Sequence, residues 1–133
     1  MNYLLDTHTW IWSQESPEKL GAQATKALTD PAQRLYVSTI STLEIARLIA
    51  VGMIELSGRL ETWISRSLGL LNGNTIELSH PIAVGAYGLP KGFHRDPADR
   101  ILVATARIHR TTLLTADQRI LKYRHVRSQD ARR

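Results

Sequence analysis

The residues of this 133-residue sequence that are best suited to chemistry are carboxylates. Four of them stand just after an apolar run or near the start of a predicted helix. Asp6 directly follows an apolar run at the start of the chain, and Asp117 comes just after the last such run. Glu44 and Asp99 each fall in the first turns of a predicted helix. If the apolar runs are parallel strands, all four carboxylates lie at the same edge of one sheet.

Four carboxylates at one edge would repel one another strongly. Two of them about 5 Å apart, at an effective dielectric constant of about 20, repel by about 3 kcal/mol. A bound cation removes this repulsion, and hard oxygen ligands suit Mg²⁺ or Mn²⁺ better than zinc. The sequence therefore predicts a metal site formed by Asp6, Glu44, Asp99 and Asp117.

Each of these residues also has a structural interpretation. Asp6 and Asp117 could cap the helices that follow them. Glu44 could close a capping box with Ser41. Asp99 could stabilise the positive end of its helix.

Two further residues beside the acids could support the site. Asp96 stands at the N-cap position of its predicted helix, with Pro97 at the first helical position. Capping is the first interpretation of Asp96, and a supporting or metal-binding role is the second. Thr115 could donate its hydroxyl to a carboxylate or a bound water, or could cap the last helix.

Short apolar runs alternate with helical patterns along the chain. The predicted strands are Asn2–Leu5, Leu35–Ser38, Thr75–Leu78 and Thr112–Leu114. The predicted helical segments are Thr9–Ser13, Glu18–Leu28, Ile40–Val51, Leu60–Leu71, Pro81–Tyr87, Asp96–His109 and Asp117–Tyr123. This order predicts an α/β fold with a mostly parallel central sheet and helices on both faces. No repeat or linker divides the chain, so residues 1–133 are predicted to form one domain.

The composition favours a polyanionic partner. Lys and Arg number 17 against 12 Asp and Glu, a net charge of +5, and such a surplus attracts nucleic acid over long distances. There is no cysteine, which excludes disulfides and thiolate catalysis. The sequence has neither a signal-peptide pattern nor a run of about 20 apolar residues. We therefore expect a cytoplasmic protein with no membrane association.

Four segments carry a stronger signal when they are taken together. They are Tyr-Leu-Leu-Asp-Thr-His-Thr-Trp around Asp6, Val-Ser-Thr-Ile-Ser-Thr-Leu-Glu-Ile-Ala around Glu44, Asp-Pro-Ala-Asp-Arg-Ile-Leu-Val-Ala-Thr-Ala at 96–106 and Leu-Leu-Thr-Ala-Asp at 113–117. In this order and spacing they resemble the PIN-domain toxins called VapC, and the resemblance spans nearly the whole chain.

The resemblance implies a PIN-like fold and a Mg²⁺- or Mn²⁺-dependent endoribonuclease that cleaves RNA by metal-activated water. Asp6, Glu44 and Asp99 would then be metal-binding catalytic acids, with Asp117 as the fourth acid and Thr115 as its hydroxyl neighbour. The resemblance also implies a VapB-type antitoxin as inhibitor and, often, a homodimer. The chain would be the toxin of a type II toxin–antitoxin system.

Other functions fit the sequence less well. A PIN nuclease of RNA processing or decay without an antitoxin is the nearest alternative. A non-enzymatic RNA-binding domain would explain the charge but not the four acids. A phosphohydrolase with Asp6 as nucleophile expects a second Asp at the position of His8, and a phospho-receiver domain needs an acceptor Asp where the third strand offers only Glu77.

Histidine catalysis is not expected, because nothing in their spacing pairs His8, His94 and His109. Trp10 and Trp12 could stack on an RNA base, but packing of the first helix is the favoured interpretation.

Arg100 follows Asp99 directly. It could hold a phosphate or form an ion pair with a neighbouring acid.

Overall fold

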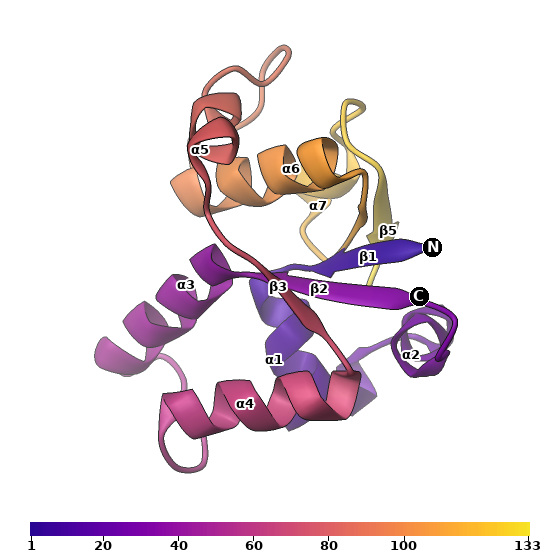
Figure 1. The fold of residues 1–133 in the computed structure, drawn as a ribbon, viewed down its shortest axis with the longest axis vertical. Coiled ribbons are helices and arrows are strands. Elements are labelled where there is room, and N and C mark those ends of the chain that lie inside the picture. The colour runs from indigo at the N-terminus through magenta and orange to yellow at the C-terminus, as the bar shows by residue number, and fades with distance from the viewer.

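The computed structural model describes all residues from Met1 to Arg133, and a five-stranded sheet lies at its centre (Figure 1). The strands are β1 (Asn2–Leu5), β2 (Arg34–Ser38), β3 (Asn74–Ile76), β4 (Thr112–Thr115) and β5 (Ser128–Asp130). Their order across the sheet is β3-β2-β1-β4-β5, and every neighbouring pair is parallel. The predicted α/β class with a parallel sheet is confirmed.

Helices cover both faces of this sheet. They are α1 (Thr7–Glu15), the short 3₁₀ helix η1 (Pro17–Lys19), α2 (Ala22–Thr29), α3 (Thr39–Ala50), α4 (Leu60–Leu71), α5 (His80–Ala86), α6 (Pro97–His109) and α7 (Gln118–Leu121). In Figure 1, α5 and α6 lie above the sheet, and α1 and α4 lie below it. None of these helices combines the length and the hydrophobicity needed to cross a membrane.

The middle strands have apolar centres because both of their faces are buried there. In β1, Tyr3 and Leu5 belong to the core cluster that α1, α2 and α4 complete, whereas Leu4 belongs to the cluster under α6 and α7. Successive side chains of a strand point to opposite faces, so the run Tyr3–Leu5 fills both layers. The four strands predicted from apolar runs are therefore all present.

The structure differs from the prediction by an additional strand and by the division of one helix. β5 was not predicted because its residues, Ser128–Asp130, are polar and carry no hydrophobic pattern; it pairs along the edge of β4. The predicted helix Glu18–Leu28 is divided, because the backbone N–H of Gly21 donates to the carbonyl of Ala131 at 3.0 Å instead of continuing a helix. A side chain at Gly21 would collide with the backbone of Arg133, 2.0 Å from an added Cβ, so this approach requires glycine.

The last helix is shorter than predicted. α7 ends at Leu121, and Tyr123 leaves the helix to pack its ring 4.8 Å from that of Phe93. The hydroxyl of Tyr123 donates to the carbonyl of Pro90. These contacts tie the loop before α6 to the end of α7, which brings two segments of the site together.

Candidate active site

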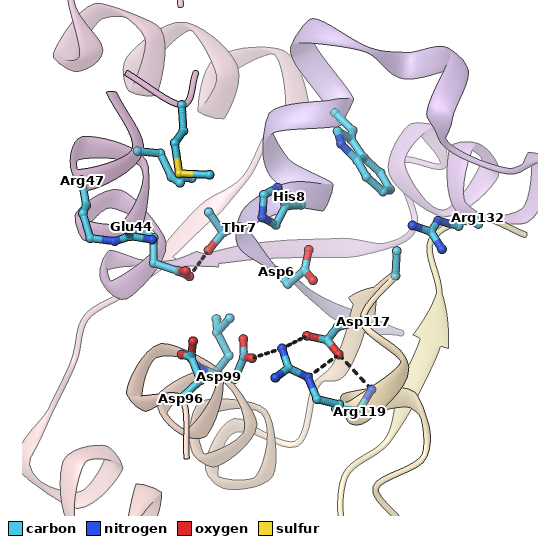
Figure 2. Close-up of a pocket in the computed structure, with 15 residues that line it drawn as sticks. Asp6, Thr7, His8, Glu44, Arg47, Asp96, Asp99, Asp117, Arg119 and Arg132 are labelled. Carbon is cyan, nitrogen blue, oxygen red and sulfur yellow. Dashed lines mark hydrogen bonds and ion pairs between the residues drawn. The ribbon is translucent and has the colours of Figure 1, made fainter. Parts of the chain in front are cut away.

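A cleft of about 440 Å³ opens at the carboxyl edge of the sheet. Five acids line it: Asp6, Glu44, Asp96, Asp99 and Asp117. In Figure 2, Glu44 lies to the left of Asp6, and Asp99 and Asp117 lie below Asp6. The parallel strand order gathers these side chains from α1, α3, α6 and the turn after β4.

Asp6 is buried at the start of α1 and accepts hydrogen bonds on both carboxylate oxygens. Its Oδ1 accepts from the backbone N–H of Thr9 at 2.8 Å, which makes Asp6 the N-cap of α1. Its Oδ2 accepts from the Thr115 hydroxyl. Burial raises the pKa of Asp6, and the hydrogen bonds from Thr115 and Thr9 oppose that rise. Asp6 is thus a cap and a cleft acid at the same time.

Thr115 connects two of the predicted acids. Its hydroxyl donates to Asp6 and accepts the backbone N–H of Asp117 at 3.0 Å. Of the two roles considered for Thr115, donation to a carboxylate is present, although that carboxylate is Asp6 and not Asp117, and the N-cap of α7 is Asp117 and not Thr115. The side chain is fully buried, so this bridge fixes the ends of β1 and β4 relative to each other.

Glu44 is half-buried on α3 and accepts a hydrogen bond from the Thr7 hydroxyl. The Thr7 oxygen also lies 2.9 Å from that of Ser41, which is buried. The capping-box interpretation is wrong, because Ser38 is the N-cap of α3 and Ser41 lies inside the helix. Burial raises the pKa of Glu44, while the Thr7 hydrogen bond lowers it.

Asp96 and Asp99 lie one turn apart at the start of α6. Asp96 is the N-cap, since its Oδ1 accepts the backbone N–H of Asp99 at 3.1 Å. The capping interpretation is confirmed, and Asp96 also lines the cleft. Burial raises the pKa of Asp99 to about 7, and the charges of Asp96, Asp117 and Glu44 add to this rise.

Asp99 and Asp117 form a tight cluster with His94, a residue that was not predicted to belong to the site. One ligand atom of each lies within 4.8 Å of the other two. His94 Nε2 is 3.1 Å from Asp99 Oδ2 but makes no hydrogen bond. Burial lowers the pKa of His94, and the nearby Arg119 lowers it further. No spacing rule could have found His94, because it reaches the cluster from an irregular loop.

Arg119 was also missed, and it lies across the same cluster (Figure 2). Its Nη2 is 3.1 Å from Asp117 Oδ2 and 3.7 Å from Asp99 Oδ2. Burial acts to raise the pKa of Asp117, but hydrogen bonds from the side chain and backbone of Arg119 outweigh burial and lower it. Asp117 is also the N-cap of α7, as one of its interpretations required.

The donor set of the cleft fits a divalent cation. Burial is the largest cause of the raised pKa of Asp99, and the charges of Asp96, Asp117 and Glu44 each raise it by more than Arg119 lowers it, so Arg119 does not fully compensate the acids. The buried Nε2 of His94 has no hydrogen-bond partner and faces the same carboxylate. Carboxylate oxygens with one imidazole nitrogen are suitable ligands for such an ion.

Comparison with known proteins identifies the family. A model of the PIN domain matches residues 3–126. The chain is also 34% identical over 124 residues to Ribonuclease VapC22 of Mycobacterium tuberculosis (strain ATCC 25618 / H37Rv), which covers 93% of each chain. The chain belongs to the PIN domain family.

Solved structures confirm the PIN-like fold. The domain is similar to a chain of VapBC2 from Rickettsia felis, crystallised with a DNA fragment from their promoter, with a TM-score of 0.72, 16% identity and coverage of 97% and 98% of the two chains. It is also similar to a chain of a toxin–antitoxin complex from Klebsiella pneumoniae, with a TM-score of 0.66, 20% identity and 97% coverage of both chains.

Several other residues of this PIN domain take roles that the sequence did not indicate. Arg100 forms none of the ion pairs, and its guanidinium donates to the carbonyls of Ala86, Phe93 and His94. It therefore positions the loop that carries His94. His8 lines the cleft, whereas His109 lies at the other end of α6 from the acids.

Proposed function

We propose that this PIN domain is a Mg²⁺- or Mn²⁺-dependent endoribonuclease and the toxin of a type II toxin–antitoxin pair. The observation that carries the proposal is the gathering of five acids in one cleft, and the charges of three of them add to the burial that raises the pKa of Asp99 to about 7. Such a cluster is unfavourable without a cation. The relative named Ribonuclease VapC22 supports RNA as the substrate, and a fold shared with toxin–antitoxin proteins supports the toxin role.

In this proposal the cation is held by Asp6, Glu44, Asp99 and Asp117, and His94 is an added candidate ligand. When bound, a divalent cation lowers the pKa of an attacking water and stabilises charge on the phosphate and on the leaving oxygen. Cleavage by water then leaves a 5′-phosphate and a 3′-hydroxyl.

The other polar residues of the cleft hold these acids in place. Thr115 and Thr9 fix the carboxylate of Asp6, and Thr7 fixes that of Glu44. Asp96 begins α6 one turn before Asp99 and so sets the position of that residue. Mutation of residues that hydrogen-bond to metal ligands typically lowers metal affinity or activity by about 10–100-fold.

The charge distribution of the cleft suits an RNA strand. Arg47 and Arg132 both line it, and in Figure 2 they lie at opposite ends with the acids between them. Phosphates on either side of the cleavage position would contact these arginines, while the central phosphate would lie at the acids. The net charge of +5 would add long-range attraction.

The proposed antitoxin is a VapB-type protein that inserts a basic side chain among the acids. Arg119 supports this idea, because its guanidinium already contacts Asp99 and Asp117 within the chain. An arginine from a partner could compete with the metal in the same way, and its planar fork pairs well with carboxylates. An inhibitor of a chain with a charge of +5 is expected to be acidic overall.

A homodimer is the other proposed assembly. Val84 and Tyr87 at α5 are 76% and 67% exposed, and Ile108 on the adjoining helix α6 is 46% exposed. A group of exposed apolar side chains of this kind is typical of a protein interface. Sedimentation of Val84→Glu should give a monomer where the unchanged chain gives a dimer.

The decisive experiment for the function measures RNA cleavage by the purified chain with Mn²⁺ or Mg²⁺ and then with EDTA. Cleavage should require the metal, and expression in cells should arrest growth unless the antitoxin is co-expressed. The exposed acid Glu77, outside the cleft, provides a matched control as Glu77→Gln. Undiminished cleavage in EDTA would refute the metal site, and harmless expression without any small partner would favour an RNA-processing nuclease over a toxin.

A further inference from the structure

The two tryptophans of α1 have different environments. Trp10 is fully buried, its Nε1 donates to Ser67 Oγ at 2.9 Å, and its ring lies 5.2 Å from that of Trp63. Trp12 is partly exposed and lines the same cleft as the acids. Packing of the helix therefore accounts for Trp10 but not for the open surface of Trp12.

The spacing of residues along α1 places Trp12 in the cleft beyond Asp6 and His8. His8 and Trp12 are four residues apart, so they are neighbours on one face of α1, and both line the cleft. Trp12 also lies six residues beyond Asp6, which corresponds to about 9 Å along the helix axis. This separation is on the scale of one nucleotide, so a strand with a phosphate at the acids could reach Trp12 with a nearby base.

Two cations adjoin the indole of Trp12. Lys19 Nζ is 5.6 Å from the ring centroid, and the Arg132 guanidinium carbon is 5.8 Å from it. Both side chains are exposed, and neither forms an ion pair with a carboxylate. An aromatic surface beside free cations is the combination that binds single-stranded nucleic acid, with a base on the ring and phosphates on the cations.

We propose that Trp12 is the stacking platform of a nucleobase subsite next to the cleavage position. One unpaired base of the RNA lies against the indole, and Lys19 and Arg132 contact the phosphates beside that base. The inference rests on the proposed ribonuclease function and narrows its substrate to RNA whose base at this position is unpaired, as in a loop. Stacking accepts any base, so the subsite selects an exposed base and not a particular one.

Tryptophan fluorescence tests this subsite directly. Trp10 and Trp63 are 0% and 3% exposed, so an oligonucleotide bound in the cleft quenches Trp12 in preference to the others. The probes are a short oligoadenylate and an abasic ribose-phosphate chain of the same length, titrated in EDTA to prevent cleavage. Oligoadenylate should quench the emission, and the abasic chain should bind through its phosphates with little quenching.

Variants separate stacking from packing. Trp12→Leu, which keeps an apolar side chain, should weaken oligoadenylate binding about tenfold and leave the affinity for the abasic chain unchanged. Trp12→Phe should recover most of the lost affinity because it keeps a ring. Trp63→Phe, at a buried position, is the matched control and should bind like the unchanged chain. The quenching of the unchanged chain tests the subsite even if Trp12→Leu does not fold.

If Trp12→Leu lost the same affinity for both probes, or lost no affinity for oligoadenylate, the proposed subsite would be overturned. A Trp12→Leu chain that binds oligoadenylate normally but no longer binds the antitoxin would overturn it as well, in favour of a protein contact. Cleavage assays keep the two proposals apart. If Trp12 binds the base but no RNA is cut, the nuclease proposal fails and the subsite stands; if RNA is cut with an unchanged KM in Trp12→Leu, the subsite fails and the nuclease stands.

Discussion

The two sides of the cleft hold their carboxylates by different means. On the hydroxyl side, defined by Asp6 and Glu44, threonine hydroxyls donate to both acids and no cation is paired with them. On the arginine side, defined by Asp99 and Asp117, Arg119 contacts both acids. A cation can therefore approach the hydroxyl side without displacing a charge, whereas the arginine side must first release its own guanidinium.

The pKa values follow the same division. Burial raises the pKa of both Asp6 and Glu44, and neutral hydroxyls offset it only in part. Arg119 lowers the pKa of Asp117, while burial and the neighbouring acids raise that of Asp99 to about 7. Hydrogen bonds from neutral hydroxyls thus hold the carboxylates of the hydroxyl side, whereas the positive charge of Arg119 holds those of the arginine side.

The largest expected effect comes from removing one carboxylate on each side. Asp6→Asn and Asp99→Asn should each reduce RNA cleavage by more than the 10–100-fold that is typical for outer partners of a metal. Both variants should stay folded, because Asn also serves as an N-cap at position 6 and a neutral amide relieves repulsion at position 99. Cleavage rates and melting curves measure the two effects. An active Asp6→Asn would exclude the hydroxyl side from catalysis.

The next effect tests whether the hydroxyls organise their side. Thr115→Val should lower activity by about 10–100-fold and stability by about 1–3 kcal/mol, because Asp6 Oδ2 and the Asp117 N–H lose their partner. Thr112 on the same strand is also buried but makes no side-chain hydrogen bond, so Thr112→Val is the matched control and should keep full activity. Equal losses in the two variants would indicate a general packing effect.

A smaller effect, of opposite sign, is expected on the arginine side. Arg119→Gln should raise the affinity for Mn²⁺ several-fold, because a positive charge no longer competes for Asp99 and Asp117. Calorimetric titration at about pH 8, above the pKa of Asp99, measures this directly. Arg66, exposed on α4 and without an ion pair, provides the control variant Arg66→Gln. A fall in metal affinity would show that Arg119 supports the site and does not compete for it.

Asp99 should also make the metal-free protein sensitive to pH. Its pKa is about 7 in the folded chain against an ordinary value of 3.8, so the folded state holds this proton more tightly than the unfolded state does. Stability in EDTA should therefore fall as pH rises from about 4 to about 7 and then level off. Asp99→Asn should lose this part of the pH dependence and be the more stable chain at pH 8. Parallel melting curves for the two chains across this range would contradict the raised pKa.

The acids on both sides were predicted from the sequence, but His94 and Arg119 on the arginine side were not. Asp6 and Thr115 stand at the ends of β1 and β4, which their apolar runs identify, so the parallel sheet alone brings them together. His94 reaches the cluster from a loop whose shape depends on hydrogen bonds from Arg100, a residue six positions later. No local pattern encodes such a contact.

The fold shows the same limit. β1, β2 and β4 were found because buried strands have apolar centres, whereas β5 pairs through its backbone and needs no apolar side chains. α7 was predicted to extend to Tyr123 because the helical pattern continues that far. In the structure the ring of Tyr123 packs on Phe93 and lies outside the helix. In each case a contact between distant segments overrides the local pattern.

The smallest expected effect concerns Asp96, which borders the arginine side as the N-cap of α6. Asp96→Ala should lower stability by about 1 kcal/mol, because the N–H of Asp99 loses its acceptor. Activity should fall far less than in Asp99→Asn, since the carboxylate of Asp99 remains. Asp96→Asn keeps the capping oxygen but removes the charge, so it should restore stability and slightly lower the pKa of Asp99, to which the Asp96 charge contributes. If both Asp96 variants are inactive while Asp99→Asn still cleaves RNA, Asp96 and not Asp99 is the catalytic acid.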